Sequence, residues 1–253
     1  MRLAWRAAGI LAGLLVCVPL TYLWKAFGAR SPWQMRFLGW TGRRCGLVVT
    51  VEGTPLTADV LYVANHVSWL DILALGGAVP AVFIARHDVA QWPAVGWMAG
   101  LNDTIYIERD RRLKVDGQAD ALRGALAKGR AIALFPEGTT DSGRELLPFR
   151  ASLFAALFPP LQGTLVQPVA IDFGARFEDV LWIDDESYGL NARRILSRPG
   201  RLPVTLRFLA PIDPGEAGDR KRLAATAQSA VAEALGGAYT ASAAGSDPLY
   251  APR

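Results

Sequence analysis

Short apolar runs alternate with stretches of helical periodicity along most of the chain. The apolar runs are rich in Val, Ile and Leu, which predicts buried strands at 46–53, 60–65, 81–86, 104–109, 131–136, 165–171 and 203–209. Apolar residues at helical spacing predict helices over 115–126, 153–157 and 219–235. Buried strands that alternate with helices indicate an α/β fold, with a mixed, largely parallel sheet flanked by helices.

The N-terminal segment has a different pattern, because the 18 residues between Arg6 and Lys25 carry no charge. This number is at the lower edge of the length that an α-helix needs to cross a bilayer. Tyr22 and Trp24 stand where interfacial aromatic residues usually stand. The sequence therefore predicts an N-terminal hydrophobic membrane helix within residues 1–30.

Two other interpretations of this segment remain open. The first is a cleaved signal peptide, although no clear A-x-A cleavage site follows the apolar residues. The second is a hydrophobic helix or helical hairpin that dips into one leaflet, with Pro19 as a kink. Gly9 and Gly13 are spaced like a helix-packing face, which is weak evidence in a segment so rich in Ala and Gly.

The rest of the chain divides into two parts. Residues 31–212 hold all the predicted strands and form one α/β domain. Residues 213–253 comprise a C-terminal helix and a loose tail, because 236–253 consists of small and polar residues. Residues 174–202 are irregular and charged, which predicts loops with at most a short helix.

The charge distribution and the cysteine content bear on the kind of partner and on the cellular location. Seven of the 27 basic residues and none of the 23 acidic residues precede Glu52. A basic, apolar N-terminus favours an anionic lipid surface, and the net acidic remainder argues against nucleic-acid binding. Cys17 and Cys45 have neither the spacing of a disulfide framework nor that of a metal site. We therefore expect a reducing, cytoplasmic location for the main domain and no bound metal.

Four segments with chemically active side chains follow predicted strands: NHVSWLD (65–71), IYIERD (105–110), FPEGTT (135–140) and VQPVAI (166–171). In open α/β sheets, binding and catalytic groups gather at the carboxyl ends of the strands. If the strands are neighbours, the four segments form one site.

His66 permits both a structural and a catalytic interpretation. In the structural one, Ser68 and Asp71 form the S-x-x-D pattern of a helix N-terminus and His66 is a loop residue. In the catalytic one, a histidine just before the first helical turn and an aspartate at its end lie side by side. Asp71 would then hold the imidazole tautomer, which leaves the other ring nitrogen to remove a proton. The second histidine, His87, has no further motif around it and is interpreted as a surface residue.

The proton that His66 removes would belong to a substrate hydroxyl or to water. The chain has no G-x-S-x-G elbow, and neither cysteine is near the motif in sequence. This pattern favours direct acyl transfer or hydrolysis over a covalent acyl-enzyme.

The other segments also have two interpretations each. Residues 135–140 form either a tight turn after a buried strand or a loop whose amides and hydroxyls hold an anion. Arg109 stands at a strand end and Arg150 precedes an apolar helix. Either arginine could make a fork-shaped contact with a phosphate or belong to a solvated face.

Taken together, the four segments resemble the glycerolipid acyltransferase family, the bacterial 1-acyl-glycerol-3-phosphate acyltransferases and their relatives. The Asn-His-x-x-x-x-Asp block of the family matches residues 65–71, and its arginine block matches 105–109. Its Phe-Pro-Glu-Gly-Thr block matches 135–139, and its apolar-Pro block matches 166–169. The resemblance covers about residues 45–210, with order and approximate spacing kept.

The resemblance implies a role for each matched residue. His66 would be the general base on the acceptor hydroxyl, and Asp71 would be its orienting partner. The substrate-binding residues would be Arg109, Glu137, Gly138, Thr139, Thr140 and Arg150, and Pro168 would shape the acyl-binding region. The acyl donor would be a thioester, acyl-CoA or acyl-ACP (acyl carrier protein), and no cofactor would be bound. The catalytic domain would contact membrane lipids on the cytoplasmic side of a bacterial inner membrane.

One departure from the family pattern bears on the acceptor. Many phosphatidate-forming members continue Glu-Gly-Thr with Arg-Ser, whereas this chain continues with Thr140, Asp141 and Ser142. FPEGTTDSG followed by LLPFRASLF looks more like the branch that acylates lyso-ornithine lipids, which carry an amine and a carboxylate rather than a bare phosphate. The leading acceptor is 1-acyl-sn-glycerol-3-phosphate, giving phosphatidic acid, because it is the commonest in the family; lyso-ornithine lipid is second. A thioester hydrolase and a non-catalytic lipid-binding protein are the rival functions.

Overall fold

The computed structural model describes residues 1–28, 30–86, 95–107, 115–140, 144–183, 186–236 and 240–241. Its α-helices are α1 (Arg2–Ala26), α2 (Trp33–Cys45), α3 (Leu70–Ala78), α4 (Val95–Leu101), α5 (Val115–Leu126), α6 (Phe177–Val180), α7 (Tyr188–Ser197), α8 (Pro214–Ala217) and α9 (Arg220–Leu235). Its strands are β1 (Leu47–Glu52), β2 (Val60–Ala64), β3 (Val82–Arg86), β4 (Ile105–Ile107), β5 (Ala131–Leu134), β6 (Glu145–Leu146), β7 (Leu165–Asp172), β8 (Leu202–Phe208) and β9 (Thr240–Ala241). Two 3-10 segments are η3 (Ala151–Leu157) and η4 (Gly174–Arg176).

Seven strands form one sheet in the order β1-β8-β7-β2-β5-β3-β4. Neighbouring strands are parallel except for β7 and β8, which are antiparallel. The prediction of a mixed, largely parallel sheet is therefore confirmed. Because β2 lies at the centre, between β5 and β7, the residues that follow it leave the sheet at its middle.

The observed elements differ from the predicted ones in several places: α2 and α4 were not predicted, α3 was predicted only by its N-terminal pattern, and the helix expected over 153–157 is the 3-10 segment η3. The strand expected over 131–136 ends at Leu134, because Gly138 adopts a φ of 79° that favours glycine and donates its N–H to the Phe135 carbonyl at 3.1 Å. Residues 174–202, expected to be loops with at most a short helix, contain η4, α6 and α7. Of the predicted tail, Gly236 and β9 are described, and the other residues of 236–253 lie outside the described part of the chain.

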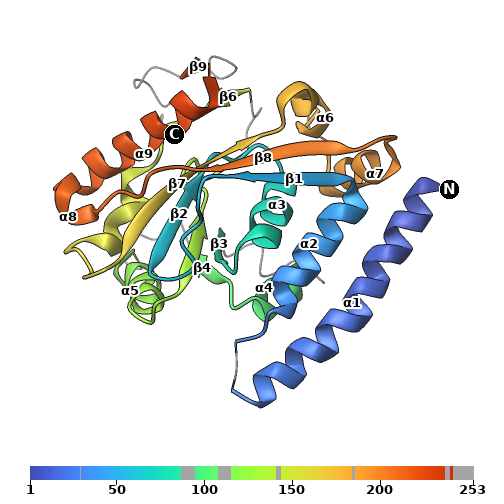
Figure 1. The fold of residues 1–253 in the computed structure, drawn as a ribbon, viewed down its shortest axis with the longest axis horizontal. Helices are drawn as coiled ribbons and strands as arrows, with labels where there is room; N and C mark the ends of the chain where they lie inside the picture. The colour runs from blue at the N-terminus through green and yellow to red at the C-terminus, as the bar shows by residue number, and fades with distance from the viewer. Residues whose placement is uncertain are drawn as a thin grey trace, which may run out of the picture.

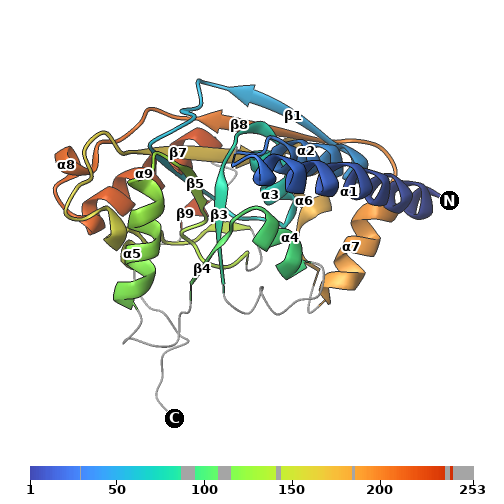
Figure 2. The same cartoon turned by 90° about the horizontal axis from the view of Figure 1, so that it is seen from below.

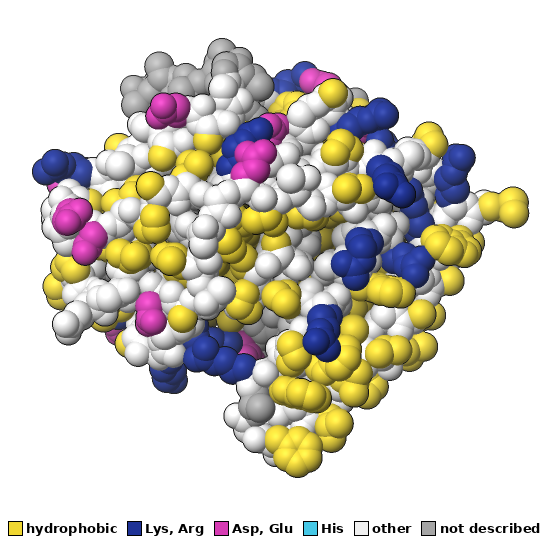
Figure 3. Space-filling model, in the orientation of Figure 1, with side chains coloured by type: hydrophobic (Ala, Val, Ile, Leu, Met, Phe, Trp, Pro, Cys, Tyr) yellow, Lys and Arg dark blue, Asp and Glu magenta, His cyan; other side chains and the backbone are white. Residues whose placement is uncertain are grey.

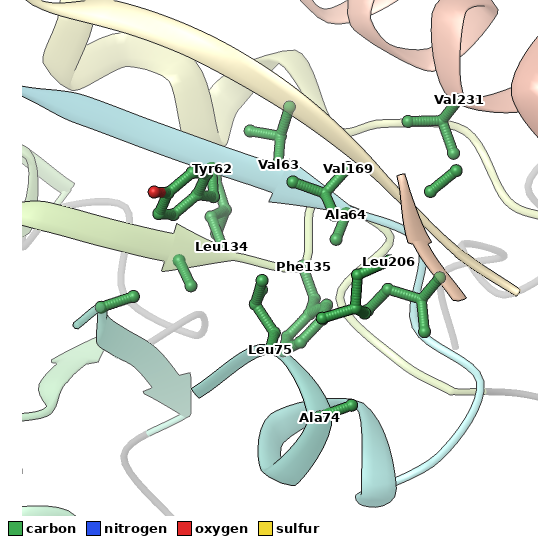
Figure 4. Close-up of a cluster of buried hydrophobic side chains, with 14 of the residues drawn as sticks. Tyr62, Val63, Ala64, Ala74, Leu75, Leu134, Phe135, Val169, Leu206 and Val231 are labelled. Atoms are coloured by element: carbon green, nitrogen blue, oxygen red, sulfur yellow. The ribbon is translucent and has the colours of Figure 1, made fainter. Parts of the chain in front are cut away.

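The hydrophobic core occupies both faces of the sheet (Figure 4). On one face, Val63 points to the side of α9, which carries Val231, whereas the paired residues Ala64 and Val169 point to the opposite face. On the other face, Leu75 of α3 lies beside Phe135. All of β2 is buried, as expected for a central parallel strand that helices cover on both sides. Figures 1 and 2 show α9 lying across the sheet from α1, α2 and α3, so the C-terminal helix completes the core.

The helices α1 and α2 form a hairpin whose arms pack together (Figure 1). The indole N–H of Trp40 donates to the Gly9 carbonyl at 2.7 Å. A Cβ on Gly13 would come within 2.5 Å of the Trp40 ring, so only glycine permits this approach. The packing face suggested by the spacing of Gly9 and Gly13 is confirmed.

Both ends of α1 are fastened to the α/β domain. Near the N-terminus, the Arg6 guanidinium donates to the Ile195 carbonyl at 3.1 Å and to the Gly200 carbonyl at 3.3 Å. Near the C-terminus, Lys25 Nζ lies 2.9 Å from Asp103 Oδ1. The helix therefore runs along the domain instead of projecting from it.

The outer face of α1 is apolar and exposed. Large hydrophobic side chains gather over α1 in Figure 3, and the exposed ones on this helix and its end include Trp5, Leu11, Leu15, Val16, Tyr22, Leu23 and Phe27. By length and composition α1 could cross a membrane, with a mean hydropathy of 1.9 over its most apolar window. Core helices of soluble proteins and signal sequences share this length and composition.

Candidate active site

Asn65 directly follows the central strand β2, and its side chain continues the hydrogen bonding of the sheet. Its Nδ2 donates to the Ile171 carbonyl at 3.0 Å, and its Oδ1 accepts from the Ile171 N–H at 2.8 Å. The last backbone pair between β2 and β7 joins Ala64 and Val169, so Asn65 extends this pairing while the main chain turns away. The sequence prediction gave Asn65 no role, although a polar residue directly after an apolar strand was the available signal.

His66 and Asp71 lie side by side. His66 Nδ1 is 2.9 Å from Asp71 Oδ2, and α3 begins at Leu70, which puts Asp71 in its first turn. The same Oδ2 accepts the backbone N–H groups of Val67 at 2.7 Å and of Ser68 at 2.8 Å. The geometry of both earlier interpretations is therefore present, because Asp71 reaches back to the amides of the turn that leads into α3 and also contacts the ring.

The contacts of the imidazole leave its second nitrogen as the acceptor. A carboxylate accepts hydrogen bonds, so Nδ1 carries the proton and Nε2 has the free lone pair. The ring stacks on Phe135, with centroids 4.1 Å apart and planes 14° apart. Asp71 is fully buried, whereas the His66 side chain is 17% exposed. His66 can therefore take a proton from a molecule that approaches Nε2.

The loop after β5 lies against His66. Glu137 is buried; its Oε1 accepts the His66 backbone N–H at 2.6 Å and its Oε2 accepts the Leu147 N–H at 2.9 Å. Gly138 closes the turn, Thr139 is exposed and Thr140 is half-buried. The structure thus brings this loop to the candidate base, and the substrate-binding roles of its residues stay predictions.

The remaining predicted residues fall in three different places. Arg150 has an exposed side chain, and its backbone N–H donates to the Pro136 carbonyl at 3.1 Å, so it borders the same loop. Pro168 is buried in β7 opposite Val63, and its part in an acyl-binding region stays a prediction. Arg109 and His87 lie outside the described residues.

Two polar side chains that the sequence analysis missed, those of Gln167 and Asn191, brace the surrounding structure. The buried Gln167 accepts the Leu56 N–H at 3.0 Å and donates to the Thr54 carbonyl at 2.9 Å, which fixes the loop before β2. The indole N–H of Trp69 donates to Asn191 Oδ1 at 2.8 Å and links α3 to α7. Neither partner could be assigned from sequence, because each contact joins segments far apart in the chain.

Among the described residues, His66 is a better candidate for acid–base catalysis than Cys45 is for nucleophilic catalysis. Burial raises the pKa of the Cys45 thiol to about 12, so at neutral pH it stays protonated and unreactive. Within the described ranges, no group of three or more His, Cys, Asp or Glu side chains could hold a metal ion. The arrangement can deprotonate a hydroxyl or a water molecule at His66.

Comparison with known proteins adds the family context. The acyltransferase family model matches residues 30–172. The lyso-ornithine lipid O-acyltransferase of Rhodobacter capsulatus is 31% identical over 93% of this chain and 90% of the relative. The enzyme of the same name from Pseudomonas aeruginosa is 37% identical and covers 78% of this chain and 77% of its own.

Relatives with a different acceptor are also similar. The 1-acyl-sn-glycerol-3-phosphate acyltransferase of Neisseria gonorrhoeae is 34% identical, over 65% of this chain and 64% of the relative. The crystal structure of the 1-acyl-sn-glycerophosphate acyltransferase PlsC from Thermotoga maritima matches with a TM-score of 0.60 and covers 93% of this chain and 96% of its own. Its sequence identity is 20%, so this match supports the fold alone.

Proposed function

Because the chain belongs to the acyltransferase family, we propose that it moves a fatty acyl chain from a thioester donor to the free hydroxyl of a lysolipid. One observation carries the proposal: the His66 imidazole is held at Nδ1 by a buried carboxylate at 2.9 Å while its ring remains partly exposed. A general base on the acceptor hydroxyl needs these two properties.

In the proposed reaction, His66 Nε2 takes the proton of the acceptor hydroxyl as the hydroxyl oxygen attacks the thioester carbonyl. The resulting oxyanion collapses to the ester and the C–S bond breaks. The imidazolium returns its proton to the departing thiolate, which leaves as the free thiol of coenzyme A or of acyl carrier protein. Asp71 stabilises the imidazolium between the two transfers, and no acyl-enzyme forms.

We propose lyso-ornithine lipid as the acceptor, with lysophosphatidate as the alternative. Two observations support this order, which reverses the one that the sequence predicts. Thr140 stands where many phosphatidate-forming relatives have arginine, so a cation that would pair with a phosphate monoester is missing from the motif. The relative similar over 93% of this chain is a lyso-ornithine lipid O-acyltransferase.

The acceptor is tested by product analysis. Purified protein in detergent would receive labelled acyl-CoA or acyl-ACP, together with lyso-ornithine lipid, lysophosphatidate or neither. We expect ester formation on lyso-ornithine lipid to be faster by about tenfold or more, a difference of about 1.4 kcal/mol in barrier. Faster acylation of lysophosphatidate would overturn the acceptor and keep the mechanism, whereas no ester from either acceptor would overturn the proposed function.

We further propose that α1 rests in one leaflet of the membrane, on the cytoplasmic side, and does not cross it. The contacts of Arg6 and Lys25 support this placement, because they hold both ends of the helix to the same domain. A helix of 25 residues is about 37 Å long. A crossing would therefore break at least one of these attachments, whereas the apolar outer face can enter a leaflet with both intact.

The double variant Leu11→Asp/Leu15→Asp should weaken binding to lipid vesicles about 10- to 100-fold, because each leucine buries apolar area on insertion. Both side chains are more than half exposed, so the fold should tolerate the change. Vesicle co-sedimentation measures the bound fraction. Ala225→Asp, which adds a charge to the exposed side of α9, is the matched control and should bind like the unmodified chain. Equal binding by the double variant would contradict the placement of α1.

A further inference from the structure

Both carboxylate oxygens of Glu137 contact main-chain amides. Oε1 accepts the N–H of His66 at 2.6 Å, and Oε2 accepts the N–H of Leu147 at 2.9 Å. The residue is 4% exposed. Hydrogen bonds to a charged acceptor are shorter and stronger than those between neutral groups. Glu137 therefore links the main chain at His66, 71 residues away, to the main chain at Leu147, 10 residues away.

The hydrogen bond from the His66 amide to Glu137 holds the main chain of His66, whereas two other residues hold its ring. Asp71 and Phe135 hold the imidazole ring, at Nδ1 and on its face. Glu137 instead accepts the backbone N–H of His66. This N–H directly follows Asn65, whose side chain is hydrogen-bonded to Ile171 of β7. Together the contacts fix the main chain and the ring, and with them the position of Nε2 in the site.

We propose that Glu137 is a positioning residue for the general base, an inference that rests on the proposed function. The family resemblance implies that this carboxylate binds the acceptor head group. Its burial and its two backbone contacts favour instead a role exerted through His66. A displacement of about 1 Å at a reacting group can lower a rate about 10²-fold, so Glu137 can affect the rate without touching substrate.

The two roles predict different kinetics for Glu137→Gln. The amide can replace only one of the two carboxylate oxygens, and its NH2 group would face a backbone N–H. We expect kcat to fall about 10- to 100-fold, the effect of losing one charge-assisted hydrogen bond, with the acceptor KM changed less than about threefold. A head-group ligand would instead raise the acceptor KM.

Two further variants separate position from charge. Glu137→Asp keeps the charge but is one methylene too short to span both amides, so it should lose kcat as Glu137→Gln does. In a His66→Ala background, Glu137→Gln should lower the residual rate by no more than about twofold, because residues that act through one group are not additive. Arg150→Gln, at the exposed edge of the same loop, is the matched control and should have the same proportional effect in both backgrounds.

Resonances of the two histidines provide a readout that does not depend on activity. Selective 15N-histidine labelling gives two backbone amide signals, from His66 and His87, which His87→Gln assigns. Glu137→Gln should move the His66 amide signal and leave that of His87 in place, and the melting temperature reports whether the variant folds.

Three outcomes would overturn the positioning role: an unmoved His66 amide signal, a raised acceptor KM at constant kcat, or additive effects of Glu137→Gln and His66→Ala. If the Glu137→Gln protein does not fold, the same kinetic test is made with Glu137→Asp. Failure of the proposed function is distinct, because the unmodified chain would then form no ester while the amide signal still reports the contact.

Discussion

Replacing His66 by alanine should lower the rate of ester formation about 10²- to 10⁴-fold, the usual contribution of a positioned general base. Alanine keeps the backbone N–H that Glu137 accepts, and the side chain removed is partly exposed, so the fold should be retained. Initial rates in detergent, with saturating donor and acceptor, measure the effect, and circular dichroism checks the fold.

His87→Ala is the matched control for this variant, because His87 is the chain's other histidine and is predicted to lie on the surface. It should keep the full rate. If His66→Ala keeps more than about a tenth of the rate, His66 is not the general base.

Replacing Asp71 by asparagine should lower the rate about 10³-fold. The variant removes the negative charge that stabilises the imidazolium. In the unmodified chain, Asp71 Oδ2 lies 2.9 Å from His66 Nδ1. For two unit charges about 4 Å apart at an effective dielectric of about 20, the interaction is about 4 kcal/mol, which corresponds to this loss. Initial rates and the melting temperature of the same preparation measure the two roles of Asp71 separately.

The structural interpretation of Asp71 predicts a different result. If Asp71 only stabilises the turn before α3, through the amides of Val67 and Ser68, the variant should melt earlier and keep its rate. Asp219→Ala is the matched control, because Asp219 caps α9 by accepting the N–H groups of Lys221 and Arg222 and is remote from the site in sequence. It should lower the melting temperature without changing the rate.

The sequence predicts those parts of the site that are set by local geometry. The closeness of His66 and Asp71 follows from one helix start, because a separation of five residues spans the turn and the first helical residues. The buried strands follow from their apolar runs, since a central parallel strand such as β2 must be apolar on both faces.

The parts that could not be predicted depend on contacts between distant segments. Glu137 reaches His66 only because β5 and β2 are neighbours, with Val63 opposite Leu134. Asn191 lies on α7, a helix of 10 residues that leaves Tyr188 and Leu190 exposed, so its apolar positions do not mark a single buried face. The hydrogen bond from Arg6 of α1 to the Ile195 carbonyl could not be predicted, because no sequence pattern in α1 or in α7 indicates it.

The most direct test of the account follows the acyl donor in the absence of acceptor. Unmodified protein would be incubated with labelled thioester, first alone and then with increasing lyso-ornithine lipid, while thiol release, ester and free fatty acid are measured together with the intact mass of the protein. Direct transfer at His66 predicts thiol release that depends on the acceptor and equals the ester formed, with the protein mass unchanged. Fatty acid released at a rate independent of acceptor, or a protein mass increased by one acyl group, would contradict it.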